Sequence, residues 1–216
     1  MSFFKGGPCW AAFFLFELNV FMMYKIYMNP ITHFLAGWTV ANIAELDKRE
    51  RVAVTVAGVI PDIDGFGLVA EKLTDNSTHP LTWWSDYHHV LAHNIFFGIL
   101  VAVACYSVAT RKRAVAALAF LSFHVHLLGD VVGAGGPDGE HWPIPYLWPV
   151  TERIQLVWQG QWAINAWQNV VITGILLMTA FVLSWRRGFS PLEMVSVPAD
   201  RVFVKTLRNR FPFPPI

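Results

Sequence analysis

The chain has 216 residues, of which 55% are hydrophobic and 14% charged, and its mean hydropathy is +0.43. A soluble domain carries about 25% charged residues, so this composition indicates a membrane protein. The formal net charge of +1 argues against direct nucleic-acid binding, which requires a strong basic excess. Cys9 and Cys105 lie in separate apolar stretches and supply neither a disulfide framework nor a cysteine-based zinc site. Any metal must therefore be held by histidine and carboxylate.

The first apolar stretch covers roughly residues 9–27 and follows Lys5. No small-residue cleavage site follows it, which argues against a secretory signal peptide. We interpret residues 1–27 as an uncleaved hydrophobic anchor. A start-site extension is the alternative, because Met28 could begin a shorter protein and Glu17 interrupts the apolar run.

Five further apolar stretches cover residues 32–46, 52–60, 90–110, 114–132 and 163–185. The last three are about 20 residues long and predict membrane-spanning helices. The first two are short and predict a helical pair that penetrates in part or packs inside the bundle. The sequence thus predicts an all-α, polytopic membrane bundle over residues 28–187. An interfacial or loosely ordered cytoplasmic tail is expected over residues 188–216.

Basic residues predict the orientation of this bundle. They form three clusters, Lys48-Arg49 with Arg51, Arg111-Lys112-Arg113, and Arg186-Arg187. Under the positive-inside rule these clusters belong to the cytoplasmic side. The connections 61–88 and 133–162 are mainly acidic and are expected on the opposite side. We therefore expect a multi-pass protein of the inner (cytoplasmic) membrane.

Three polar clusters interrupt the apolar sequence. They are Pro61-Asp62-Ile63-Asp64, His88-His89 with His93, and His124-Val125-His126 with Asp130. Aspartate and histidine are costly to bury unless something satisfies them, and a divalent metal centre accounts for so many of them together. The predicted topology brings all three clusters, and His33, to the extracytoplasmic ends of their segments. The sequence therefore predicts a His/Asp metal site at one end of the bundle.

The spacing of these residues suits metal ligands. His126 and Asp130 are four residues apart and share a helical face, and His89 and His93 have the same spacing. Asp62 and Asp64 follow a proline, and one could be a terminal ligand while the other bridges. Such a set suits zinc, manganese or iron, with room for two or more ions. A centre of this kind activates water near neutral pH and clamps a phosphoryl oxygen.

Other chemistries have little support in the sequence. It contains no G-x-S-x-G elbow, no phosphate-binding glycine loop and no H-E-x-x-H motif. Trp83, Trp84, Trp142 and Trp148 lie in the outer connections. An interfacial aromatic belt explains them better than a substrate-stacking role.

Five segments resemble a known family when taken in order. They are MNPITHFLAG at 28–37, PDID at 61–64, HHVLAHN at 88–94, HLLGD at 126–130 and LWP at 147–149. This pattern, over roughly residues 28–150, is similar to the YdjM-type family of inner-membrane metal-dependent hydrolases, with distant kinship to zinc-dependent phospholipase C and P1-type nucleases. The resemblance implies a metal-ligand set of His33, Asp62, Asp64, His88, His93, His126 and Asp130. His89 and His124 would be additional ligands or would orient the others.

The chain departs from the family pattern in one segment. The family typically reads His-Arg-Gly-x-Thr-His-Ser, whereas here His89, Val90, Ala92 and Asn94 replace Arg, Gly, Thr and Ser. The resemblance implies that the family's arginine contacts phosphate or orients another residue, and this chain lacks that contact. This change bears on turnover more than on metal binding.

The leading hypothesis from the sequence is a membrane-bound, metal-dependent hydrolase that cleaves a phosphoester through metal-activated water. The substrate would be a lipid or lipid-linked compound, the metal zinc, and the catalytic residues Asp62, Asp64 and His93. The alternative is a catalytically silent, metal-stabilised scaffold or accessory subunit, with a membrane protein as its partner. Metal or proton transport is a third reading, but the cytoplasmic half lacks a continuing polar track.

Overall fold

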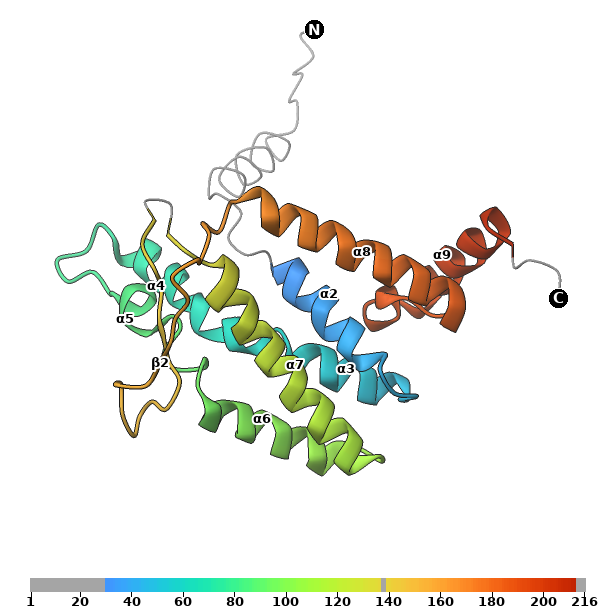
Figure 1. Ribbon diagram of the computed structural model, residues 1–216, viewed down its shortest axis with the longest axis horizontal. Helices are drawn as coiled ribbons and strands as arrows, with labels where there is room; N and C mark the ends of the chain where they lie inside the picture. Colours follow the sequence, from blue (N-terminus) through green and yellow to red (C-terminus); the bar gives the residue numbers. More distant parts are fainter. Residues whose placement is uncertain (1–29, 137–138, 213–216) are drawn as a thin grey trace, which may run out of the picture.

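The computed structural model describes residues 30–136 and 139–212, so the expected anchor at 1–27 lies outside the described residues. The helical elements of the bundle are α2 Pro30–Ala41, α3 Lys48–Ala57, the 3-10 helix η1 Ile60–Phe66, α4 Gly67–Thr74, α5 Trp83–Tyr87, α6 Ile95–Val108 and α7 Lys112–Gly133. A short antiparallel pair, β1 Ile144–Pro145 and β2 Gln155–Leu156, precedes α8 Trp167–Arg187, the 3-10 helix η2 Pro191–Met194 and α9 Val197–Arg210. Figure 1 shows the arrangement, and the all-α prediction is confirmed.

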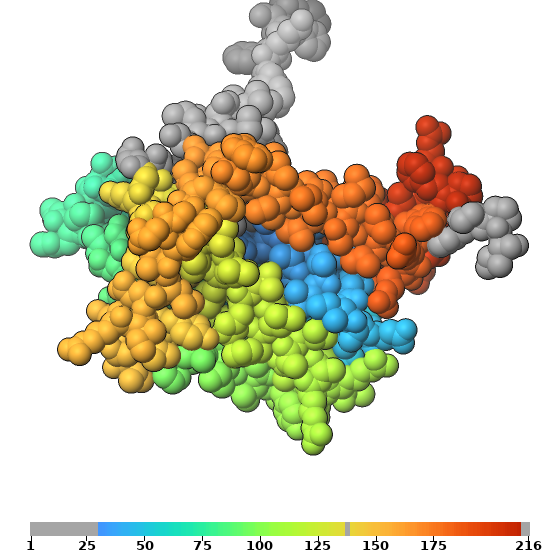
Figure 2. Space-filling model, in the orientation of Figure 1, coloured from blue at the N-terminus to red at the C-terminus, as the bar shows by residue number. Residues whose placement is uncertain are grey.

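Helix α7 is the centre of the bundle and packs against α2, α3 and α6. Its Val115, Ala119 and Phe123 are fully buried and form the core with residues such as Val54 of α3. The two short apolar stretches of the sequence thus form α2 and α3 and pack inside the bundle. Figure 2 shows the blue atoms of α2 between the yellow-green atoms of α7 and the orange atoms of α8.

Small residues allow α2, α3 and α7 to approach closely. A Cβ added at Gly37 of α2 would lie 2.8 Å from the carbonyl oxygen of Thr55 on α3. A Cβ added at Gly58, directly after α3, would lie 2.5 Å from Ser122 Oγ on α7. Small residues at such crossings are typical of membrane helices. The crossing holds the start of η1 against α7.

Among the described residues, two helices, α7 and α8, are long and apolar enough to cross a membrane. Helix α3 and the η1–α4 segment pass the same test together and are bent by 52° where they meet, which suits a broken span or a re-entrant loop. Helix α8 contacts α2 through Ala180, whereas Val170, Ile175 and Met178 are exposed. Such an apolar, exposed helix fits a lipid environment.

The stretch 90–110 does not form one long helix as predicted. Asn94 caps α6, because its side-chain oxygen accepts a hydrogen bond from the Phe97 backbone N–H at 3.0 Å. Asparagine is among the best N-caps, so the helix begins at Ile95 and has 14 residues. His89 and His93 consequently precede the helix and do not share a helical face.

The C-terminal segment is docked on the bundle rather than loosely ordered. Arg51 of α3 forms a buried, bidentate ion pair with Glu193 of η2, with N–O distances of 2.7 and 2.8 Å. The Arg51 guanidinium also lies 3.6 Å from the centre of the Phe189 ring. Helix α9 follows and packs on α8, where Phe203 meets Phe181 edge to face.

The three basic clusters gather at one end of the bundle, where α2 ends and α3 and α7 begin. Arg111 donates to the Glu45 carbonyl oxygen. Arg187 Nη2 donates to the Asn42 carbonyl oxygen at 3.1 Å, while Arg51 donates to the Leu46 carbonyl oxygen. The polar clusters with histidine and aspartate lie at the opposite ends of these helices.

Candidate metal centre

Four segments that are distant in sequence bring histidine and aspartate side chains together. His33 comes from the first turn of α2, Asp62 from η1, His93 from the turn before α6, and His126 and Asp130 from the last turns of α7. All but Asp62 are almost fully buried. These five residues are called the His/Asp cluster below.

The Asp130 carboxylate lies at the centre of the His/Asp cluster. Its Oδ1 is 3.2 Å from His33 Nε2. Its Oδ2 is 3.0 Å from His126 Nε2 and 3.4 Å from His93 Nε2. Asp62 Oδ1 lies 3.6 Å from His126 Nε2. The prediction that His126 and Asp130 share a helical face is confirmed.

Neighbouring oxygens fix the tautomers of His126 and His93. His126 Nδ1 donates to the Gly58 carbonyl oxygen at 2.9 Å, and His93 Nδ1 donates to Asp64 Oδ2 at 3.0 Å. With both Nδ1 atoms so engaged, the two Nε2 atoms face each other at 3.2 Å. Two bare lone pairs at this distance repel, and a proton or a metal ion between them would stabilise the pair.

Asp64 and His88 lie behind His93 rather than in the centre of the His/Asp cluster. Asp64 Oδ1 accepts from His88 Nδ1 at 2.9 Å, and its Oδ2 accepts from the Ala92 backbone N–H at 3.3 Å. A carboxylate that accepts the outer N–H of a ligand histidine orients the ring and raises its basicity. Both Asp64 oxygens accept hydrogen bonds, so Asp64 lies in a position that orients His93 and His88. Which of Asp62 and Asp64 would bridge two ions stays a prediction.

The residues of the His/Asp cluster fit a divalent cation. His33 Nε2, Asp62 Oδ2 and Asp130 Oδ2 are buried and make no hydrogen bond within the described part of the chain, whereas buried polar atoms normally have partners. Ligand atoms on a tetrahedral zinc ion lie about 3.3 Å apart, close to the separations observed here. Imidazole nitrogens and carboxylate oxygens together suit zinc, manganese or iron.

The electrostatic setting differs between the two histidines that precede α6. Burial lowers the pKa of His93, but the carboxylates of Asp130 and Asp64 outweigh it and raise this pKa to about 9. A positive charge at His93 is therefore stabilised. Burial, with His93 and His88 nearby, holds the pKa of His89 well below its usual value.

His124 does not join the His/Asp cluster. Its Nδ1 donates to the Phe120 carbonyl oxygen and its Nε2 accepts from the Tyr146 hydroxyl, both at 2.8 Å. It therefore lies on another face of α7 and links this helix to the β1 segment. His124 was considered as a ligand or an orienting residue, and the structure places it away from both positions.

Two tryptophans of the expected aromatic belt lie beside the histidines. Trp84 stacks on His88 with ring centres 3.7 Å apart, and Trp142 meets the His89 ring edge-on at 5.7 Å. The Gly58 carbonyl and Trp84 are the contributors that the sequence did not reveal. The proximity of Gly58 to the PDID segment was the available signal for its role. A backbone carbonyl can accept a hydrogen bond at any residue type, so the sequence does not identify it as an acceptor.

Asp62 is the open side of the His/Asp cluster. Its side chain is 28% exposed, whereas those of His93 and His126 are fully enclosed. The residues beyond it, Ile63 and Phe66, are exposed and apolar. Asp62 is thus the most exposed member of the His/Asp cluster and adjoins an apolar surface.

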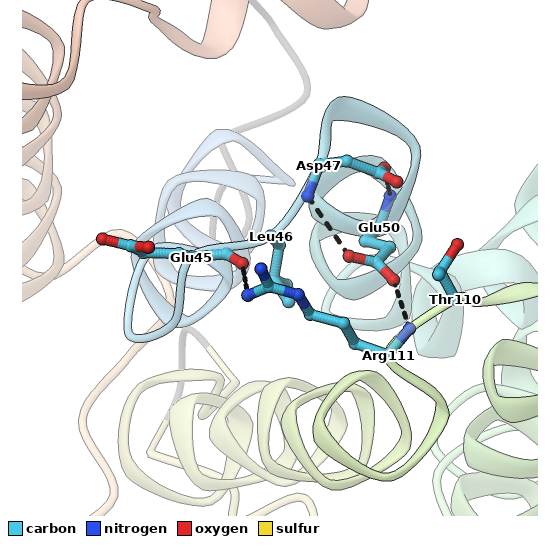
Figure 3. Close-up of a pocket in the computed structure, with 6 residues that line it drawn as sticks. All are labelled: Glu45, Leu46, Asp47, Glu50, Thr110 and Arg111. Atoms are coloured by element: carbon cyan, nitrogen blue, oxygen red, sulfur yellow. Dashed lines mark hydrogen bonds between the residues drawn. The ribbon is translucent and has the colours of Figure 1, made fainter.

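A separate hollow lies at the opposite end of the bundle (Figure 3). Its polar groups are engaged in holding the chain. Glu50 accepts from the Asp47 and Arg111 backbone N–H groups at 3.2 and 2.7 Å, and Asp47 accepts from the Glu50 backbone N–H at 2.9 Å. This capping box fixes the start of α3 against the α6–α7 turn, so we assign the hollow a structural role.

Fold and site together define a helical membrane protein with histidine and aspartate groups that could hold a metal ion. The family model described as YdjM inner membrane protein matches residues 28–204. The chain therefore belongs to the YdjM inner membrane protein family, as the five sequence segments indicated, and the match extends well beyond them. No curated protein and no solved structure matches the chain.

Proposed function

We propose that this protein is a divalent-metal-dependent hydrolase of the inner membrane that cleaves a phosphoester in a lipid or lipid-linked substrate, with zinc as the preferred metal. The observation that carries the proposal is the pair of Nε2 atoms of His93 and His126, which face each other at 3.2 Å beside the buried Asp130 carboxylate. A cation would stabilise this arrangement, and the donor set suits a divalent metal.

The position of each residue in the site suggests its role. A divalent ion held in the His/Asp cluster would activate a water molecule and polarise a phosphoryl oxygen. Asp62, the exposed member, faces the approaching substrate. His93 supplies the ligand nitrogen, and Asp64 keeps that nitrogen pointed at the cluster by accepting the Nδ1 proton.

Apolar residues next to Asp62 support a lipid-linked substrate. Ile63, Phe66, Val69 and Leu73 are all exposed, with Leu73 at 82%, and they follow Asp62 along η1 and α4. Acyl chains bury such surfaces favourably. We also infer that the centre lies toward the extracytoplasmic side, because the basic clusters gather at the other end.

Metal analysis and hydrolysis assays on protein purified in detergent test the proposal. We expect stoichiometric divalent metal and hydrolysis of a phosphodiester lipid, with activity reduced at least about 100-fold in Asp62→Asn. His79→Ala, in an exposed loop, is the control and should retain activity. Absence of bound metal, or full activity in an Asp62→Asn plus His126→Ala double variant, would overturn it.

One observation favours a second candidate, a metal-stabilised scaffold or accessory subunit without turnover. His33, His93, His126 and Asp130 are each at most 3% exposed, which suits a closed structural site. This candidate predicts bound metal, no hydrolysis of any phosphoester in a broad panel, and a membrane protein that co-purifies in fixed ratio. Turnover that depends on Asp62 decides against it.

A further inference from the structure

His89 is held in an unusual backbone conformation inside the protein. Its φ is +65° and its residue exposure is 6%. The left-handed region is uncommon for a residue that has a Cβ atom, and such conformations persist where the surroundings enforce them. Hydrogen bonds from the Val90 and Leu91 backbone N–H groups to the Tyr87 carbonyl oxygen, at 3.0 and 3.2 Å, close this turn.

The turn directs the His89 ring toward the other histidines. Its ring centre lies 4.2 Å from that of His88 and 4.7 Å from that of His93. Within the described chain, no hydrogen bond joins either nitrogen of the His89 ring to another group. A buried imidazole with both nitrogens free of protein partners has the chemistry of a metal ligand.

The ligand atoms near Asp130 form two groups. His33, Asp62 and His126 offer one set of atoms within 4.8 Å of one another, and His89, His93 and Asp130 offer a second set within the same limit. Together they are six donor residues, whereas a tetrahedral ion takes four ligands. Asp130 has one oxygen beside His33 and the other beside His93 and His126, so this carboxylate contacts histidines of both groups.

We propose that His89, with His93 and Asp130, forms a second divalent-cation site, so that the centre holds two ions bridged by the Asp130 carboxylate. His33, Asp62 and His126 then hold the first ion. With two ions, the facing Nε2 atoms of His126 and His93 would each bind one, the first and the second respectively. Paired ions in such centres lie about 3.5–4 Å apart, which a single carboxylate spans. This inference rests on the proposed function, since it concerns the same metal centre.

Metal stoichiometry of the purified full-length chain tests the second site. Metal-free protein in detergent is titrated with Zn²⁺ by calorimetry and, in parallel, with Co²⁺ by absorption spectroscopy. We expect two ions per chain in the wild type and one in His89→Gly, with the remaining site unchanged in affinity within about threefold. Glycine adopts a positive φ freely, so this variant removes the ligand without straining the turn.

His89→Asn is the second variant, because asparagine also tolerates the left-handed region and fills part of the space of the ring. It should likewise bind one ion, while His124→Gln, outside the cluster, should bind two. Two ions in both His89 variants would overturn the second site, as would one ion in the wild type. One ion in the wild type leaves the proposed function standing, whereas none overturns that proposal as well.

Discussion

Asp130 is the residue on which the His/Asp cluster depends most. Its two oxygens contact three imidazoles, from α2, from α7 and from the turn before α6. It is 3% exposed, so its charge has little access to water and must be balanced by cations in the protein. Loss of this one carboxylate would therefore affect all three imidazoles at once.

Asp130→Asn should weaken Zn²⁺ binding at least about 100-fold, because the amide keeps the shape but loses the negative charge that a divalent ion needs. Competition with a coloured zinc chelator measures the affinity. His124→Gln is the matched control, because His124 lies on the same helix but outside the His/Asp cluster. This variant should bind Zn²⁺ as tightly as the wild type does. Equal affinity in Asp130→Asn would show that the metal lies elsewhere.

Substitution of Asp64 should have a smaller effect on metal affinity, since Asp64 orients His93 and His88 instead of contacting the centre of the His/Asp cluster. Asp64→Asn should lower metal affinity by about 10- to 100-fold, the range for residues that support a ligand. The same chelator competition measures it. A loss as complete as that in Asp130→Asn would instead make Asp64 a direct ligand, as the sequence suggested.

The contrast between Asp130 and Asp64 shows what the sequence could predict about the site. The pairing of His126 with Asp130 follows from helical periodicity, which is local. The role of Asp64 depends on how η1 meets the turn at 88–94, which is a tertiary contact. The helix start at Ile95 depends on the Asn94 cap. Asn94 lies within a longer apolar stretch, and the apolar pattern alone does not show that a helix begins there.

At the level of elements, the crossing of α2, α3 and α7 positions the centre. Gly37 is one helical turn beyond His33, and Gly58 supplies the carbonyl oxygen that orients His126. The close approach leaves no room for a side chain at either glycine. The same contact that packs the helices thus places two histidines of the His/Asp cluster, His33 and His126.

Gly37→Ala should destabilise the protein by about 1–3 kcal/mol, the usual cost of overpacking, because its Cβ would meet the Thr55 carbonyl oxygen and Ser122 Oγ. It should also reduce metal content by displacing His33. Thermal unfolding in detergent and metal analysis measure the two effects. Gly174→Ala on α8, where a Cβ meets nothing within 4 Å, should be neutral or stabilising by up to about 1 kcal/mol.

The docking of the C-terminal elements depends on the ion pair between Arg51 and Glu193. Breaking a buried pair by removing one partner typically costs about 3–5 kcal/mol, so Glu193→Gln should lower the unfolding temperature clearly. Metal content should stay the same, because this pair lies at the end of α3 away from the centre. Asp75→Asn, in an exposed pair with Lys72, is the control and should change stability by less than about 1 kcal/mol. Metal loss in Glu193→Gln would reveal coupling between the two ends.

At the scale of the whole molecule, the chain separates its charges along the bundle. The basic clusters lie at one end and the His/Asp cluster at the other, and the apolar α7 and α8 run between. Composition and the distribution of charge predicted this separation, because both reflect the membrane environment rather than particular contacts. The docked tail and the short α6 could not be predicted in this way, since each depends on one specific polar contact.

This separation of charge predicts the orientation in the membrane. Single cysteines at Glu152 and Thr110, both exposed, report on the two ends once Cys9 and Cys105 are replaced by serine. Glu152 lies in the loop joined to the start of α6 through Tyr146, and Thr110 lies in the basic α6–α7 turn. In spheroplasts, a membrane-impermeant maleimide should label Glu152→Cys directly and Thr110→Cys only after the membrane is permeabilised. The reverse pattern would put the metal centre on the cytoplasmic side, because the basic residues would then face outward against the positive-inside rule.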